Sequence, residues 1–571
     1  MPPIVNHACY IDTEDANRYR SCGAWLDITL YDYLTKNAVL HPQREALIEP
    51  LNKEDYLGVA PRRFSWCELL ASVNALSRLL QRLGVGHGDV VMVQLPNTWE
   101  SVAMLFAVTR LGGIVSPISS QSREAELAHA IACLQPVVYV CSRNLKGTDY
   151  AAYFEDHLPS FHGSVLAIED LPDLTEPGGA TDLAAGAPVE DRPSADDIAT
   201  ICWTSGTEGS PKAVPRTHNN WNASAIGVSQ GFGMGAEPEQ ILLPFPLINT
   251  AAIGGVTMPW LYNGGTLVLH QPFELQVLVE QLISEKITVM LAAPTALQAI
   301  LRSPVIQQAG EALRLRAVGC GSAAPSPSLL THYEQALNIS IINMFGANEG
   351  TLLCSDKTLI PDPNDRATLF PRVGLSEVIW SNSAANWLSS RLLDVDTGEE
   401  ITCPDRTGML LVKGPSIFPG YFRNGVLDRS SFTEDGFFKT GDLFQIIQCH
   451  GKSHYLKVVG RQKELVIRGG YNISPLEIDA ALAEFPDVVE LACGGIIDAH
   501  FGERLCVYVV LGENTTTSLS GVCSFLETKG LAKTKWPEKI VVIEALPRNA
   551  LNKVVRAELQ NQSVIWEEAA F

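Results

Sequence analysis

Short, mostly apolar runs bounded by turn-forming residues recur through the first half of the chain. Runs of this length favour buried strands. The strands predicted on this basis are residues 90–95, 137–140, 265–269 and 287–291. Residues 99–111 and 274–285 have helical length and lie between such runs. Strands that alternate with helices predict an α/β fold with a large N-terminal region of mostly parallel, doubly wound sheets.

The longest uncharged stretch runs from residue 241 to residue 273 and contains no Asp, Glu, Lys or Arg. An apolar segment of this length can indicate a membrane helix. Pro244, Pro246, Pro259 and two Gly-Gly pairs interrupt it, and these residues are poorly suited to one continuous helix. We therefore expect buried core here and predict no membrane span.

The C-terminal part of the chain has a character of its own. A helix is predicted over about residues 475–485, and strands are predicted near residues 491–497 and 505–511. A small α+β unit is therefore expected after the large α/β region. Residues 170–193 are rich in Pro, Gly, Ala and Asp, which is typical of an exposed connection.

Composition limits the classes of partner. The 571 residues are too many for one hydrophobic core, and 42 Lys and Arg against 63 Asp and Glu give a formal net charge of −21. This charge disfavours nucleic acid and anionic membranes as partners. The 13 cysteines include no Cys-x-x-Cys pair. With no signal peptide and no peroxisomal Ser-Lys-Leu ending, a reducing cytoplasm is expected.

Residues 204–212, Thr-Ser-Gly-Thr-Glu-Gly-Ser-Pro-Lys, follow the apolar run 199–203. Small residues let backbone N–H groups approach an anion, hydroxyls add donors, and Lys212 supplies a movable positive charge. This stretch therefore predicts a cradle for the phosphates of ATP. It is not a Walker-type P-loop, because Pro211 precedes Lys212 and Ala213 follows it.

The order of these residues resembles the Thr-Ser-Gly-Thr-Thr-Gly-x-Pro-Lys signature of adenylate-forming enzymes. That family includes acyl-CoA synthetases, luciferases and the adenylation domains of peptide synthetases. Four further segments resemble later motifs of the family in the expected order: residues 343–349, 439–442, 460–477 and 546–553. Five ordered motifs that span most of the chain make coincidence a poor explanation.

The resemblance implies roles for individual residues. Glu349 would hold Mg²⁺ between phosphate oxygens, and Asp442 would accept hydrogen bonds from the ribose hydroxyls, with Arg461 close by. Lys553 would bridge the substrate carboxylate and the α-phosphate. Catalytic roles fall to Lys553, Glu349 and Thr204. The other residues expected at the nucleotide are Ser205, Gly206, Thr207, Gly209, Lys212 and Asn348.

The same resemblance divides the chain into a large adenylation domain, residues 1–462, and a small mobile lid, residues 463–571, with the hinge at Lys463. In the family the lid presents one face for adenylation and then turns to present another for transfer to a thiol. Gly469, Gly470 and Tyr471 resemble the form typical of CoA ligases, in which a pantetheine arm passes close to the backbone. CoA is therefore expected at these three residues.

The acyl pocket is expected to have small and apolar walls. The candidate lining residues are Phe245, Leu247, Ile248, Asn249, Gly319, Gly321 and Met344. Peptide-synthetase adenylation domains hold an amino acid's ammonium group with an Asp in this region, whereas residues 244–255 contain no acidic residue. A free α-amino acid is thus disfavoured, and a fatty, aromatic or alicyclic carboxylic acid fits best.

Departures from the family pattern keep alternatives open. Glu208 places a carboxylate beside the phosphate loop, and Asn552 replaces the usual Gly before Lys553. Asn249 stands where many acyl-CoA synthetases carry a His. The leading hypothesis is an ATP-dependent acid:CoA ligase that forms an acyl-adenylate and then an acyl-CoA thioester, with release of AMP and pyrophosphate. One alternative is a stand-alone adenylating enzyme that loads a separate carrier protein of a secondary-metabolite assembly line. Another is a non-catalytic protein that binds acyl-adenylates.

Overall fold

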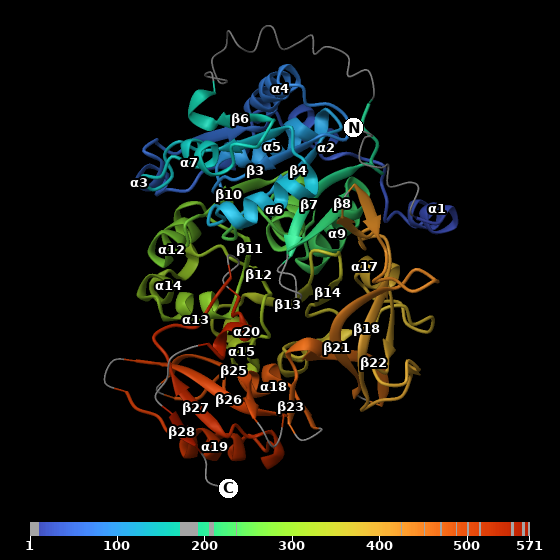
Figure 1. Ribbon diagram of the computed structural model, residues 1–571, viewed down its shortest axis with the longest axis vertical. Helices are drawn as coiled ribbons and strands as arrows, with labels where there is room; N and C mark the ends of the chain where they lie inside the picture. The colour runs from blue at the N-terminus through green and yellow to red at the C-terminus, as the bar shows by residue number, and fades with distance from the viewer. Residues whose placement is uncertain are drawn as a thin grey trace.

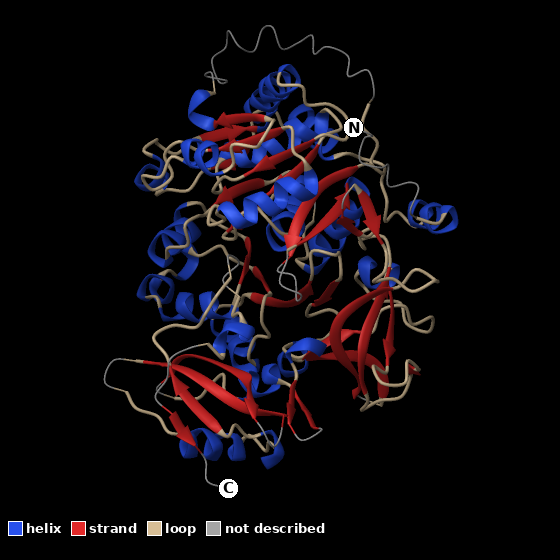
Figure 2. Cartoon of the chain, viewed as in Figure 1, coloured by secondary structure: helices blue, strands red, loops and turns tan. Residues whose placement is uncertain are grey.

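The computed structural model describes residues 11–568 except 172–191, 205–210, 236, 424, 450, 469–470, 487, 499–501, 513–514, 550–552 and 562–565. Most of the predicted exposed connection and the tip of the phosphate loop therefore lie outside the described residues. Figure 1 shows the N-terminal sheets in blue to green, a group of orange strands beside them, and the C-terminal unit in red at the lower end of the view. Helices lie on both sides of the upper strands (Figure 2).

The first sheet has eight strands in the order β20-β19-β8-β7-β4-β3-β5-β6. Its strands are β3 (Val90–Val93), β4 (Ile114–Pro117), β5 (Val138–Cys141), β6 (Ser164–Ala167), β7 (Ile198–Thr204), β8 (Lys212–Thr217), β19 (Tyr421–Arg423) and β20 (Val426–Asp428). β3 pairs in parallel with both β4 and β5, while β8, β19 and β20 extend the β7 edge as antiparallel strands. The predicted strands near residues 90 and 138 are confirmed.

The second sheet also has eight strands, in the order β14-β13-β12-β11-β9-β10-β1-β2. Its strands are β1 (Glu45–Ile48), β2 (Arg63–Ser65), β9 (Gln240–Leu243), β10 (Thr266–Leu269), β11 (Val289–Ala292), β12 (Ala317–Cys320), β13 (Ser340–Gly346) and β14 (Leu352–Ser355). The run from β13 to β1 is parallel, and only the edge strands β14 and β2 are antiparallel. Both large sheets therefore confirm the mostly parallel α/β prediction.

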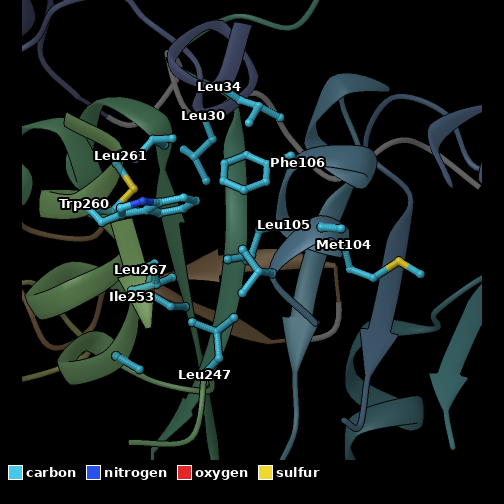
Figure 3. Close-up of a cluster of buried hydrophobic side chains, with 14 of the residues drawn as sticks. Leu30, Leu34, Met104, Leu105, Phe106, Leu247, Ile253, Trp260, Leu261 and Leu267 are labelled. Carbon is cyan, nitrogen blue, oxygen red and sulfur yellow. The ribbon is translucent and has the colours of Figure 1, made fainter. Parts of the chain in front are cut away.

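The main core is formed by helices packed between these sheets. They are α2 (Leu30–Leu40), α4 (Trp66–Arg82), α5 (Trp99–Arg110), α9 (His218–Gly231) and α11 (Met258–Asn263). α5 begins at a capping box formed by Thr98 and Ser101, and nearly all of its residues are buried. Figure 3 shows Phe106 of α5 close to Trp260 of α11, and their rings meet edge to face at 6.2 Å between centroids.

Further helices cover the outer faces of the large sheets or lie at the surface. They are α1 (Thr13–Ser21), α3 (Lys53–Leu57), α6 (Glu124–Leu134), α7 (Tyr150–His157), α12 (Leu275–Ser284), α13 (Pro294–Arg302), α14 (Pro304–Gln308), α15 (Pro327–Ala336), α16 (Pro363–Arg366) and α17 (Ser383–Trp387). α12 and β11 confirm the helix and the strand predicted after residue 273. α12, α13 and α15 bury apolar residues in the core cluster on the outer face of the second sheet.

Most of the uncharged stretch is buried, as predicted. It forms β9, the short helix α10 (Thr250–Ala252), a π-helical turn (Ile253–Thr257), α11 and β10. Pro259 lies in the first turn of α11, where the lack of a backbone N–H is tolerated. No helix in the described ranges combines the length and the apolar character that crossing a membrane requires.

A third sheet, which the sequence did not predict, follows the parallel ones. It is antiparallel, with strand order β15-β22-β21-β18-β16-β17. Its strands are β15 (Leu369–Pro371), β16 (Ser389–Leu393), β17 (Glu400–Ile401), β18 (Thr407–Lys413), β21 (Phe438–Cys449) and β22 (Lys452–Arg461). One face packs on a separate core cluster around Leu410, Phe444 and Leu456. This sheet brings the segment of residues 439–442 to the site described below.

The C-terminal unit has its own sheet and core. Its strands are β23 (Val466–Arg468), β24 (Tyr471–Ile473), β25 (Val488–Asp498), β26 (Gly502–Leu511), β27 (Lys539–Val542) and β28 (Trp566–Glu568). Its helices are α18 (Pro475–Ala481), α19 (Leu519–Thr528) and α20 (Arg556–Leu559). Val466, Ile478, Val507 and Val522 belong to one buried cluster of this unit. The small α+β unit is thus confirmed, although α18 is shorter than predicted.

A buried group of charges lies where α3 meets the start of α5. Glu49 is fully buried and accepts a hydrogen bond from Lys53 Nζ at 2.7 Å and from the backbone N–H of Trp99 at 3.0 Å. Glu100 is 8% exposed, and its Oε2 has no hydrogen-bond partner among the described residues. Burial away from water raises the pKa of the Glu100 carboxyl to about 7. The positive charge of Lys53 opposes this rise, and the negative charge of Glu49 adds to it.

Glu100 makes a pH-dependent contribution to stability. Its pKa is about 7 in the folded protein against 4.5 ordinarily, so the folded state binds the proton more tightly and loses stability as pH rises from about 4.5 to about 7. That difference corresponds to about 3 kcal/mol. We expect Glu100→Gln to flatten the dependence of thermal unfolding on pH between pH 5 and pH 8 and to raise the midpoint at pH 8. An unchanged slope would contradict this assignment.

Candidate functional site

The residues on either side of the phosphate loop belong to the paired antiparallel strands β7 and β8 of the first sheet. β7 ends at Thr204 and β8 begins at Lys212, and these two residues are paired across the hairpin. Ser205, Gly206, Thr207 and Gly209 lie outside the described residues. Trp203 Nε1 donates to Ser116 Oγ at 3.0 Å, which ties the hairpin stem to the end of β4. The stem therefore holds Thr204 and Lys212 at the carboxyl end of the parallel strands, where ligands bind in such sheets.

Tyr421 connects the hairpin lysine with Glu349. Lys212 Nζ lies 4.8 Å from the centre of the Tyr421 ring, and the Tyr421 hydroxyl donates to Glu349 Oε1 at 2.7 Å. Burial away from water raises the pKa of the Tyr421 hydroxyl, and the negative charge of Glu349 raises it further. The phenol therefore keeps its proton and can donate it in the hydrogen bond. Sequence reasoning missed Tyr421. Its only signal was a Pro-Gly-Tyr turn far from the recognised motifs.

Backbone contacts hold Glu349 from the other side. The N–H of Phe418 donates to the Glu349 carbonyl at 2.8 Å. Gly350 has φ +99°, and a β-carbon on it would lie 1.9 Å from the carbonyl oxygen of Ser416. Only glycine permits both this conformation and this approach. The half-buried Glu349 is therefore held by one segment, residues 416–421, that is distant from it in sequence.

Asn348 joins the hairpin to the predicted acyl pocket. It is 7% exposed. Its Nδ2 donates to the Trp203 carbonyl at 3.0 Å, and its Oδ1 accepts from the backbone N–H of Thr250 at 2.8 Å. One side chain thus fixes the phosphate hairpin relative to the start of α10. This is a use for Asn in place of the Thr found in the family pattern.

Arg216 is a buried cation that the sequence analysis did not single out. Its side chain is fully buried, and its Nη1 donates to the Asn348 carbonyl at 3.2 Å. Its Nη2 donates to Ser224 Oγ at 2.9 Å, and its guanidinium carbon lies 4.1 Å from the centre of the Trp221 ring. Among the described residues no carboxylate forms an ion pair with it. Burial lowers the pKa of the Arg216 guanidinium to about 9. Interactions with Cys202 and Glu349 oppose this lowering.

Asp442 and Arg461 face each other across the β21–β22 hairpin. Arg461 Nε donates to Asp442 Oδ1 at 3.1 Å. Asp442 is 5% exposed. Loss of water raises the pKa of its carboxyl to about 6, and the Arg461 charge opposes this rise. One carboxylate oxygen of Asp442 is paired with Arg461. The other oxygen can accept hydrogen bonds from the hydroxyl groups of a ligand.

Lys553 faces this same group of charges. Asn549 closes its turn, because Asn549 Oδ1 accepts from the Lys553 N–H at 3.0 Å and the Asn549 N–H donates to the Lys553 carbonyl at 2.9 Å. Burial away from water lowers the pKa of the Lys553 ammonium, and the positive charge of Arg461 lowers it further. Part of the residue's surface is nevertheless exposed. Asp442, Glu464 and Glu349 oppose this shift. Lys553 of the C-terminal unit therefore lies within electrostatic reach of Asp442 and Arg461 on the third sheet and of Glu349.

Lys463 lies between the third sheet and the C-terminal sheet. It occupies the short 3-10 turn Gln462–Glu464 that separates β22 from β23. Arg556, three residues after Lys553, has its Nε 3.6 Å from Glu464 Oε2 and its Nη2 2.5 Å from Asp479 Oδ2. The segment that carries Lys553 is thus attached to the turn that contains Lys463.

The predicted acyl-pocket residues differ in their exposure. Phe245 and Ile248 are half-buried, and Leu247 lies in the main core near Ile253 (Figure 3). Asn249 is 8% exposed, and its Oδ1 accepts from the Ala252 N–H at 3.1 Å as the N-cap of α10. Gly319, Gly321 and Met344 lie on or beside the neighbouring strands β12 and β13.

The CoA prediction lies largely outside what the structure describes. Gly469 and Gly470 are not described, and Tyr471 begins β24, where its backbone pairs with Arg468 of β23. Among the described residues no group of His, Cys, Asp and Glu has the arrangement of a protein-only metal site.

Two family profiles match this chain. The one described as AMP-binding enzyme matches residues 34–422, and the one described as AMP-binding enzyme C-terminal domain matches residues 477–553. Similar curated proteins include a medium-chain fatty-acid–CoA ligase of Escherichia coli (strain K12), 27% identical over 94% of this chain and 90% of that protein. Another is a salicylyl-CoA synthase / salicylate adenylyltransferase of a Streptomyces species, 27% identical over 96% of each chain.

Solved structures show the same architecture. ATP-bound MatB from Rhodopseudomonas palustris aligns with a TM-score of 0.75 at 25% identity, over 94% of this chain and 99% of that one. The o-succinylbenzoate CoA synthetase of Bacillus subtilis, in complex with its acyl-adenylate intermediate, aligns with a TM-score of 0.71 at 24% identity, over 93% of this chain and 98% of that one. With a family profile that covers most of its length, this chain belongs to the AMP-binding enzyme family and is an adenylate-forming ligase of the acyl-CoA synthetase type.

Proposed function

We propose that this chain joins a carboxylic acid without an α-amino group to the α-phosphate of ATP and then transfers the acyl group to the thiol of CoA. One observation carries the proposal: Lys553 of the C-terminal unit lies within electrostatic reach of Asp442, Arg461 and Glu349 of the large region. These residues come from separate motifs, and their meeting at one place supports a shared nucleotide site. The acyl-CoA ligase relatives support the second half of the reaction.

In the first step a carboxylate oxygen of the acid attacks the α-phosphorus, and pyrophosphate leaves. Both reactants are anions, so neutralisation of charge is the main requirement. The Lys553 ammonium can contact the carboxylate and the α-phosphate together. Thr204 and Lys212, with Ser205, Gly206, Thr207 and Gly209 of the loop, would hold the departing phosphates.

Glu349 fits a magnesium ion that arrives with ATP. Tyr421 occupies one of its carboxylate oxygens, which leaves the other for a metal. Mg²⁺ prefers hard oxygen ligands and is usually bound through one or two carboxylates plus substrate phosphates. When bound there, it would neutralise charge on the phosphate oxygens, and Lys212 and Lys553 would contribute positive charge from either side.

Asp442 is proposed to orient the ribose of the nucleotide. Its depth in the site makes the charged carboxylate costly, and Arg461 offsets part of this cost through the 3.1 Å hydrogen bond. Ribose hydroxyls would then donate to the remaining oxygen. This contact fixes the α-phosphate relative to Lys553, which supports in-line attack.

The second step would use the other face of the C-terminal unit. We assign the hinge to Lys463, at the boundary between residues 1–462 and 463–571, and the passage of the pantetheine arm to Gly469, Gly470 and Tyr471. The thiolate attacks the acyl carbonyl, and AMP leaves with the bonding electrons. A separate carrier protein, the alternative that the sequence analysis left open, would accept the acyl group through the same kind of thiol.

The proposal is tested by incubating the full chain with ATP, Mg²⁺ and a panel of aromatic and aliphatic acids while pyrophosphate release is followed with and without CoA. We expect CoA to stimulate release and an acyl-CoA to be detected by mass. Release of pyrophosphate without a thioester would move the assignment to the carrier-protein alternative. No release with any acid would favour the non-catalytic alternative.

A further inference from the structure

The inner end of the predicted acyl pocket lies between two walls that contain glycine. One wall is the π-helical turn with Gly254 and Gly255, and the other is β12 with Gly319. A wall of glycine leaves room for a ligand unless another side chain takes the space. The identity of that side chain therefore determines how deep the pocket is.

Leu291 of β11 takes this space from both sides. A β-carbon placed on Gly319 would lie 2.4 Å from Leu291 Cδ1, and one placed on Gly255 would lie 3.0 Å from Leu291 Cδ2. Both distances are shorter than van der Waals contact, so the two methyl groups touch both walls. Leu291 is 5% exposed. It spans the gap between the π-helical turn and β12.

Three larger side chains complete the closure. Met344 Sδ and Phe232 Cζ lie 2.9 Å and 3.0 Å from the β-carbon position on Gly319, and Trp221 Cζ3 lies 2.9 Å from that on Gly254. Met344 is 9% exposed, Phe232 3% and Trp221 not at all. Exposure increases toward Gly321 and Ile248, which are half-buried. With this pattern of burial, the predicted pocket would open beside Gly321 and end at Leu291.

From this geometry, and resting on the function proposed above, we infer that Leu291, Met344, Phe232 and Trp221 close the inner end of the acyl pocket. The chain then takes compact acids, such as benzoic acids and short aliphatic acids, in preference to long-chain fatty acids. A long chain would have to displace well-packed side chains from a close-packed interior, which is unfavourable. The sulfur and aromatic surfaces at the end of the pocket also suit an aromatic ring.

The test compares benzoic, butanoic, octanoic and dodecanoic acids by kcat/KM for pyrophosphate release. We expect benzoic acid to exceed dodecanoic acid by tenfold or more. Leu291→Ala is expected to raise the octanoic-to-benzoic ratio by at least tenfold, because the space it frees can hold additional methylene groups. The matched control is Met290→Ala, since Met290 is the adjacent, fully buried residue of β11 and packs into the core cluster on the opposite face. The octanoic-to-benzoic ratio of the Met290→Ala variant should equal that of the unsubstituted protein.

A second measurement separates this inference from the proposed function. Binding of non-hydrolysable benzoyl and dodecanoyl adenosine-sulfamate analogues is measured by calorimetry on the unsubstituted protein, and it needs no turnover. Tighter binding of the benzoyl analogue supports the short pocket even if no acid releases pyrophosphate, in which case only the proposed function fails. Tighter binding of the dodecanoyl analogue, or a preference for dodecanoic acid in turnover, overturns the inference.

Discussion

Replacing Lys553 with alanine is expected to slow acyl-adenylate formation by about 100- to 1000-fold, the usual effect of removing one group that stabilises charge in a transition state. The substitution removes the only positive charge that the C-terminal unit is proposed to place between the carboxylate and the α-phosphate. The neighbouring Arg461 cannot replace it, because its guanidinium is paired with Asp442. Single-turnover pyrophosphate release at saturating ATP and acid measures this step directly.

The two half-reactions separate the role of Lys553 from general damage. With chemically prepared acyl-adenylate, transfer to CoA should proceed in the Lys553→Ala variant at close to the unsubstituted rate, because a different face of the lid is proposed to serve that step. Lys535→Ala is the control within the same unit, since Lys535 forms a surface ion pair with Glu477 at 2.7 Å. Equal loss of both half-reactions in Lys553→Ala would show that the residue does not act selectively in adenylation.

The parallel sheets were predictable because their strands are short apolar runs buried on both faces. β3, β5, β10 and β11 all read as such runs. The third sheet was not predictable in the same way. β21 mixes buried with half-buried and exposed residues without regular alternation and contains Lys439 and Asp442, so it lacks the period-2 pattern that predicts a strand. β21 is held in the sheet by pairing with β18, which is distant in sequence, and with β22. Both pairings contain an irregularity in register.

The site shows a similar division. Thr204, Glu349, Asp442 and Lys553 stand in local motifs, so the sequence could indicate them. Tyr421, Arg216 and Leu291 have no such signal, because each acts through a partner that only the fold brings close. Arg216 lies in a buried strand where a charge is unexpected, and that anomaly alone could have drawn attention to it. Tyr421 and Leu291 are ordinary residues for their elements.

Replacing Lys53 with methionine is expected to destabilise the large region by about 3–5 kcal/mol, because it leaves Glu49 charged and buried with no cation beside it. The side chains of Lys53 and Glu49 are 2% and 0% exposed, and among the described residues the backbone N–H groups of Trp99 and Arg62 also donate to Glu49. Adding Glu49→Gln to Lys53→Met should recover part of the loss, since the unpaired charge is then removed.

Lys529→Met is the matched control, because its ion pair with Glu484 lies at the surface and such pairs contribute only about 0–1 kcal/mol. Denaturant unfolding at pH 7 measures all three variants, and a similar small effect in each would mean that the buried pair contributes no more than the exposed one.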